Sequence, residues 1–127
     1  MGFEYVSKLP TPDEIRAQFP LAPELAAEKA RKDAAIRDVF TGDSDKFLVI
    51  IGPCSADRED AVIDYVNRLA KVQEKVKDKL ILVPRIYTNK PRTTGDGYKG
   101  LLHQPNPEGK PNLYQGLIAI ALLQIAV

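Results

Sequence analysis

The sequence predicts an α/β fold built on a strand-helix-strand unit in the middle of the chain. Two runs of β-preferring apolar residues, 46–51 and 80–87, are typical of strands buried on both faces of a parallel sheet. Between them, residues 59–77 carry apolar side chains at helical spacing: Ala61, Val62, Tyr65, Val66, Leu69, Val72 and Val76. A strand, a helix and a second strand in this order form the crossover that joins two parallel strands.

The end of the first strand is the first place to look for function. Gly52-Pro53 interrupts the strand, and Cys54 follows at its carboxyl end, the edge at which parallel α/β folds place their chemistry. Ser55 or Asp57 is predicted to cap the next helix. A lone cysteine is more often a small buried hydrophobe than a ligand or nucleophile, so both interpretations of Cys54 stay open on composition.

The second strand contains a proline, Pro84, which has no amide hydrogen for a ladder hydrogen bond. The sequence therefore predicts a bulge at this position, or a pairing made through the carbonyl alone.

Two helices are predicted before the first strand. Thr11 as N-cap, Pro12 at the first helical position and Glu14 two residues later form a capping box. A second, amphipathic helix starts at Pro23 and ends at a glycine cap, Gly42. We expect residues 1–44 to be an N-terminal helical extension laid against a main domain of residues 45–127.

A long loop is predicted from Thr88 to Pro111, and a last helix from Leu113 that is capped by Asn112. The second half of this helix is apolar all round, so we expect the isolated chain to self-associate, to aggregate, or to be stable only against further structure. Residues 85–110 hold five fixed cations against two carboxylates, namely Arg85, Lys90, Arg92, Lys99 and Lys110 against Asp96 and Glu108. The segment is either a site for phosphorylated or carboxylated anions or a solvated basic loop.

The composition excludes several classes of function. The net charge is +1, which gives no indication of a nucleic-acid or membrane partner. The single cysteine cannot form an internal disulfide, and the N-terminus lacks the layout of a signal peptide, so we expect a soluble, cytoplasmic protein. His103 is the only histidine, and no Walker-type phosphate loop is present.

Four motifs follow one another along the chain: Ile51-Gly52-Pro53-Cys54-Ser55, Arg85-Ile86-Tyr87, Lys90-Pro91-Arg92-Thr93-Thr94 and Tyr98-Lys99-Gly100-Leu101. Together they resemble class I 3-deoxy-D-arabino-heptulosonate 7-phosphate (DAHP) synthases. The resemblance implies a (β/α)8 barrel that condenses phosphoenolpyruvate with erythrose 4-phosphate and releases phosphate, at the start of the shikimate pathway of aromatic amino-acid biosynthesis. It also implies a divalent metal of the Mn, Fe, Co or Zn type, a homo-oligomer, and feedback inhibition by an aromatic amino acid.

The resemblance assigns a role to five residues. Cys54 matches the metal-binding cysteine, and Arg85 matches an arginine that holds phosphoenolpyruvate. Lys90 matches a catalytic lysine that contacts the substrates and is a candidate proton donor. Arg92 and Thr93 match the pair that binds the phosphate of erythrose 4-phosphate. In such a mechanism the metal would polarise the aldehyde while the cations hold both phosphates.

The match covers only the amino-terminal third of such an enzyme. A barrel of this kind needs about 250 residues, and the family's other metal ligands, a histidine, a glutamate and an aspartate, come after the part that this chain matches. We therefore expect an incomplete first portion of the barrel that does not turn over unaided. Two alternatives stay open: a non-catalytic module that binds phosphate or other anions, and an interaction fragment.

Overall fold

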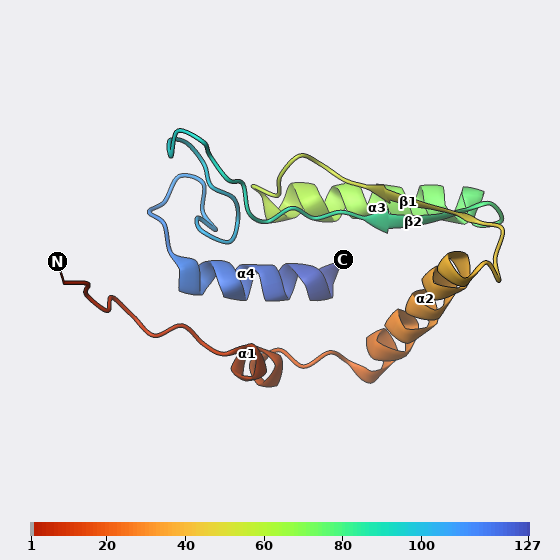
Figure 1. Ribbon diagram of the computed structural model, residues 1–127, viewed down its shortest axis with the longest axis horizontal. Coiled ribbons are helices and arrows are strands. Elements are labelled where there is room, and N and C mark those ends of the chain that lie inside the picture. Colours follow the sequence, from red (N-terminus) through yellow and green to blue (C-terminus); the bar gives the residue numbers. More distant parts are fainter. Residues whose placement is uncertain (1) are drawn as a thin grey trace.

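The computed structural model describes residues 2–127, which form four helices and a two-stranded parallel sheet, so the α/β class is confirmed (Figure 1). In chain order the elements are α1 (Pro12–Gln18), α2 (Pro23–Thr41), β1 (Phe47–Ile51), α3 (Glu59–Val76), β2 (Leu80–Pro84) and α4 (Leu113–Ala126). Within residues 2–127, no helix is both long and apolar enough to span a bilayer.

The two strands pair in parallel register from Phe47 opposite Leu80 to Ile51 opposite Pro84. The predicted bulge at Pro84 is wrong, because the register runs through this residue without interruption. The Arg85 N–H donates to the Ile51 carbonyl at 2.9 Å. The backbone N–H and C=O groups of the odd-numbered residues of β2 therefore point toward β1. Backbone groups alternate in direction along a strand. The backbone nitrogen of Pro84 therefore points to the other edge of β2, so its lack of an N–H removes no hydrogen bond to β1.

The sequence predicted that β2 would end at Tyr87, but the strand ends at Pro84. The cause is the partner strand: β1 ends at Ile51, and Gly52-Pro53 then turns away, which leaves residues beyond Arg85 without a ladder to join.

The outer edge of β2 is covered by a side chain of α3. Gln73 donates its amide to the Leu80 carbonyl at 3.0 Å and accepts the Leu82 N–H at 2.6 Å. An unpaired strand edge is a template for pairing with another chain. Gln73 satisfies two backbone groups of that edge, the Leu80 carbonyl and the Leu82 N–H, within the same chain.

The helix α3 begins at Glu59, as the apolar spacing predicted, but the predicted capping by Ser55 or Asp57 is wrong. Its N-cap is Arg58, which makes no capping hydrogen bond with its side chain. The backbone before it is used elsewhere, since the Ala56 N–H donates to the Tyr87 carbonyl at 2.8 Å. This long-range bond holds residue 56 in the loop that precedes the helix.

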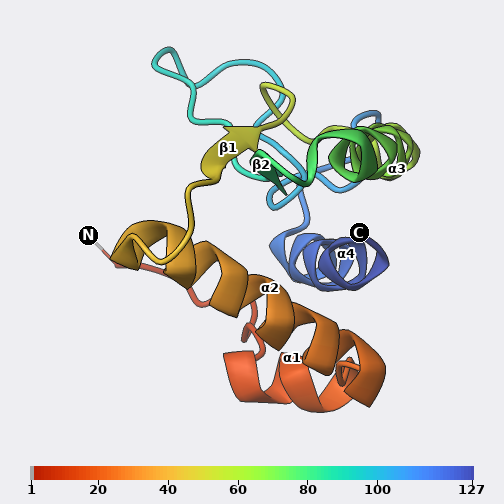
Figure 2. The ribbon, with the colours of Figure 1, turned by 90° about the vertical axis from the view of Figure 1, so that its right-hand side faces the viewer.

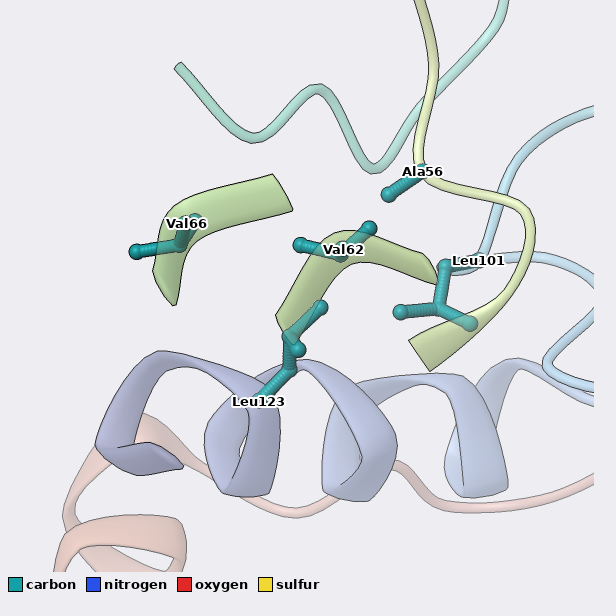
Figure 3. Close-up of a cluster of buried hydrophobic side chains, with 5 residues drawn as sticks. All are labelled: Ala56, Val62, Val66, Leu101 and Leu123. Carbon is teal, nitrogen blue, oxygen red and sulfur yellow. The ribbon is translucent and has the colours of Figure 1, made fainter. Parts of the chain in front are cut away.

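The strand β1 is not buried on both faces, contrary to the prediction. Phe47 is 75% exposed and Ile50 is 64% exposed. The core lies instead between α3, α4 and two loops, as Figure 3 shows: its buried members are Ala56, Val62, Val66, Leu101 and Leu123. α4 therefore packs one residue, Leu123, fully inside this cluster, while Leu122 beside it stays 44% exposed.

The two N-terminal helices have the ends that the sequence predicted. The Thr11–Glu14 capping box is present, and Gly42 closes α2 in a left-handed conformation with φ of 82°. However, neither helix buries a residue, and Figures 1 and 2 show both set apart from α3 and the sheet. The extension nevertheless touches the rest of the chain at two places: α2 contacts β1, and a hollow lined by Lys8, Leu9, Pro10, Glu14, Gln18 and Tyr114 lies between α1 and the start of α4.

Candidate functional site

The loops that follow β1 and β2 lie against each other, and glycine makes this approach possible. A Cβ atom on Gly52 would collide with the Arg85 carbonyl oxygen. The Arg85 guanidinium donates back across the same junction, from Nη1 to the Pro53 carbonyl at 3.0 Å. It also lies over the Tyr87 ring, with its central carbon 4.6 Å from the ring centre. Arg85 is thus a solvent-exposed cation fixed beside the turn that carries Cys54.

Cys54 is a free, exposed thiol, so the interpretation of it as a buried hydrophobe is wrong. Exposure at the carboxyl end of β1 suits a metal ligand. Within residues 2–127, however, no group of three or more His, Cys, Asp or Glu side chains lies close enough to hold a metal ion. Structural and catalytic metal sites use three or four protein ligands. The described residues therefore supply one candidate ligand and not a complete metal site.

The basic loop is an ordered structure pinned at its base. The Lys90 N–H donates to the Lys99 carbonyl at 2.8 Å, and the Leu102 N–H donates to the Thr88 carbonyl at 2.9 Å. Gly100, at φ of 97°, allows the two sides to approach, because a Cβ atom there would overlap the Thr88 carbonyl oxygen. Residues 88–102 thus form a closed hairpin-like loop with exposed Arg92 and Lys99 side chains, which is compatible both with an anion site and with a solvated basic loop.

Arg92 stands at the outer turn of this loop. Its Nε donates to the Tyr98 carbonyl at 2.9 Å, and its guanidinium lies over Gly97. This bond uses only one of the five N–H donors of the side chain. The four donors on the two terminal nitrogens remain on an exposed residue beside Thr93, which is exposed as well.

The predicted site residues thus fall into two groups. Cys54 and Arg85 lie on the two loops joined at Pro53, and Lys90, Arg92 and Thr93 lie on the pinned loop. Ala56, two residues after Cys54, ties the groups together. Its N–H donates to the Tyr87 carbonyl, and its carbonyl accepts the Tyr98 hydroxyl at 3.4 Å. A separate open hollow of about 500 Å3, lined by Asp57–Asp60, Ile63 and Pro105–Pro107, contains none of these residues.

Sequence reasoning missed what Tyr98, Gly52 and Gly100 do for this arrangement. Burial, with the Asp57 carboxylate as a smaller cause, raises the pKa of Tyr98, so its phenol is protonated at neutral pH. The signal was present in the motifs, since a glycine next to a site residue often marks close approach of two backbones. Which backbones approach each other becomes clear only in three dimensions.

Comparison with known proteins assigns the chain to a family. A family model described as "DAHP synthetase I family" matches residues 19–118. A phospho-2-dehydro-3-deoxyheptonate aldolase of Corynebacterium glutamicum is 38% identical over 110 residues, which cover 87% of this chain and 30% of that protein. The Tyr-sensitive aldolase of Escherichia coli is 37% identical over 109 residues, which cover 86% of this chain and 30% of that protein.

The fold of the chain is also similar to that of a solved structure. The structure of the phospho-2-dehydro-3-deoxyheptonate aldolase from Francisella tularensis SCHU S4 superposes with a TM-score of 0.85 at 24% identity, over 98% of this chain and 37% of that one. The chain thus spans about a third of the length of these relatives. Because the family model matches most of its residues, the chain belongs to the DAHP synthetase I family.

Proposed function

We propose that this chain takes part in the condensation of phosphoenolpyruvate with erythrose 4-phosphate to give DAHP and phosphate. In this proposal the chain supplies the first strands and the substrate loop of a (β/α)8 barrel. One observation supports it most: two exposed arginines, Arg85 and Arg92, are fixed through hydrogen bonds to backbone carbonyls in the loops that follow β1 and β2. Both keep unused N–H donors, as a reaction between two phosphorylated substrates requires.

The two arginines would hold different substrates. Arg85, anchored between Pro53 and the Tyr87 ring, would bind phosphoenolpyruvate. Arg92, with Thr93 beside it, would bind the phosphate of erythrose 4-phosphate. Lys90 sits between them in sequence at the base of the loop, where its backbone is fixed by Lys99. Its ammonium group would contact both substrates and serve as the proton donor. Fixed cations would thus align the reacting carbons.

A divalent metal of the Mn, Fe, Co or Zn type fits this site only in part. Cys54 offers an exposed thiol as one ligand, and within residues 2–127 the remaining ligands are not assembled. We propose that the metal binds tightly only when carboxylate and imidazole ligands from further residues complete the set, and that without them the chain does not turn over. A titration of the chain with Mn²⁺ or Zn²⁺ should therefore show no tight stoichiometric site.

Relatives whose names are Tyr-sensitive and Phe-sensitive lead us to propose feedback inhibition by an aromatic amino acid for the assembled enzyme. We also propose that it is a homo-oligomer, as the family resemblance implies, and that it acts in the cytoplasm, as the single cysteine led us to expect.

The test is a binding experiment with two ligands and two variants. Phosphoenolpyruvate and erythrose 4-phosphate are titrated separately at low salt, because exposed charge interactions are screened as salt rises. Arg92→Ala should weaken erythrose 4-phosphate more than phosphoenolpyruvate, and Arg85→Ala should do the reverse. Equal losses for both ligands would indicate a general anion-binding module and contradict the assigned roles.

A further inference from the structure

The turn formed by residues 92–98 is closed by two hydrogen bonds of its own, and a third bond links it to the loop after β1. At one end, the Arg92 side chain closes the turn through its bond to the Tyr98 carbonyl at 2.9 Å. A backbone bond from the Gly95 N–H to the Arg92 carbonyl, at 3.1 Å, tightens the same turn. The orientation of the Arg92 guanidinium therefore depends on where the backbone of Tyr98 is held.

Tyr98 is in turn anchored by its own side chain. The phenol hydroxyl donates to the Ala56 carbonyl, 42 residues earlier, at 3.4 Å. Ala56 is a fixed point, since it is 0% exposed and its N–H is bound to the Tyr87 carbonyl. The half-buried Tyr98 ring thus connects the turn that carries Arg92 to the loop that carries Cys54.

We propose that Tyr98 is a positioning residue, whose hydroxyl acts on phosphate binding through Arg92 by fixing the 92–98 turn to Ala56. The proposal rests on the proposed function in one respect, that Arg92 binds a phosphate. Its mechanism is preorganisation: an arginine that is already held in place loses less conformational freedom when the anion arrives. A tyrosine phenol is a hydrogen-bond donor at physiological pH, and burial raises the pKa of Tyr98 further above that range.

The experiment is a double-mutant cycle on the full 127-residue chain, with inorganic phosphate as the probe and binding followed by 31P NMR. Tyr98→Phe removes only the hydroxyl, and Tyr114→Phe is the matched control on α4, outside this chain of bonds. Loss of one such hydrogen bond should weaken phosphate binding about two- to tenfold in the parent chain. In the Arg92→Ala background, Tyr98→Phe should cause no further loss.

Each outcome decides the question. If Tyr98→Phe weakens phosphate binding by the same factor in the Arg92→Ala background, Tyr98 has a general structural role and the inference is overturned. Unchanged phosphate affinity in Tyr98→Phe alone would overturn it as well. If Arg92→Ala itself leaves phosphate binding unchanged, the proposed role of Arg92 fails instead. Amide exchange then tests the positioning separately: Tyr98→Phe should speed exchange at Gly95 severalfold and Tyr114→Phe should not, and equal exchange would overturn it.

Discussion

The N-terminal helices and the unit formed by β1, α3, β2 and α4 are stabilised in different ways. α1 and α2 bury no residue and rely on local devices: the capping box at Thr11, the glycine cap at Gly42, and surface ion pairs three or four residues apart. The second unit has only a few charged pairs on the surface of α3 but shares a buried cluster that joins helices and loops distant in sequence.

The difference explains where the candidate site lies. Local devices hold a helix but do not fix one loop against another. Cys54, Arg85 and Arg92 are placed by contacts between segments that are 30 or more residues apart, such as Arg85 with Pro53 and Tyr98 with Ala56. The second unit is thus the one in which a substitution far from the loops should still change ligand binding.

The largest expected contrast is between two glycines. Gly52→Ala puts a methyl group into the Arg85 carbonyl, so it should destabilise the second unit by about 3 kcal/mol or more. Gly42→Ala has open space and strains only a left-handed residue, at a cost of about 1 kcal/mol confined to the end of α2. Thermal melts of both variants check this. Similar losses of stability in the two variants would contradict the difference between the N-terminal helices and the second unit.

Next in size is the removal of a core side chain. Leu123→Ala empties a position that is 0% exposed and should cost about 2–5 kcal/mol. Phe40→Ala removes a larger side chain that is 77% exposed on α2, so its effect should stay within about 0.5 kcal/mol. Denaturant unfolding measures both, and a larger loss for Phe40→Ala would mean that α2 packs on the second unit in solution.

These two pairs also separate what the sequence could predict from what it could not. The Thr11 box, the Gly42 cap and the Asn112 cap were predictable because each is set by residues within one turn of the helix end. The start of α3 at Glu59 was predictable from the apolar spacing as well. The bond that holds Ala56 in the preceding loop and the burial of the core between α3 and α4 were not, because they depend on Tyr87 and Leu101, which are remote in sequence.

The site shows the same division. The motifs identified Cys54, Arg85 and Arg92, whereas the bonds that position the two arginines, through Pro53 and Tyr98, involve partners that no spacing rule indicates.

A smaller effect is expected at the sheet edge. Gln73→Ala frees the Leu80 carbonyl and the Leu82 N–H, at a cost of about 1 kcal/mol. The exposed Phe47 and Ile50 already favour self-association of the chain, and the freed edge of β2 should increase it. Sedimentation velocity at low micromolar concentration compares Gln73→Ala with Glu74→Ala, a substitution of the exposed neighbour on α3. Monodisperse monomers in the parent and in both variants would contradict this expectation.

The smallest effect concerns α1 alone. Thr11→Ala removes the hydroxyl that accepts the Glu14 N–H at 3.2 Å and should weaken this helix by about 1 kcal/mol. Circular dichroism should show a small loss of helix with no change in the main melting transition, and Ser7→Ala, in the exposed N-terminal segment, should show neither. A shifted main transition would mean that α1 is coupled to the second unit.

The most direct test of the account is hydrogen exchange of the whole chain with and without inorganic phosphate. Amides of α1 and α2 should exchange fast in both conditions, because no buried contact protects them. Amides of α3 and β2 should exchange slowly, and phosphate should slow exchange selectively in residues 85–102, where Arg85 and Arg92 lie. Protection by phosphate in α1 or α2, or none in residues 85–102, would contradict the assignment of the anion site to the loops of the second unit.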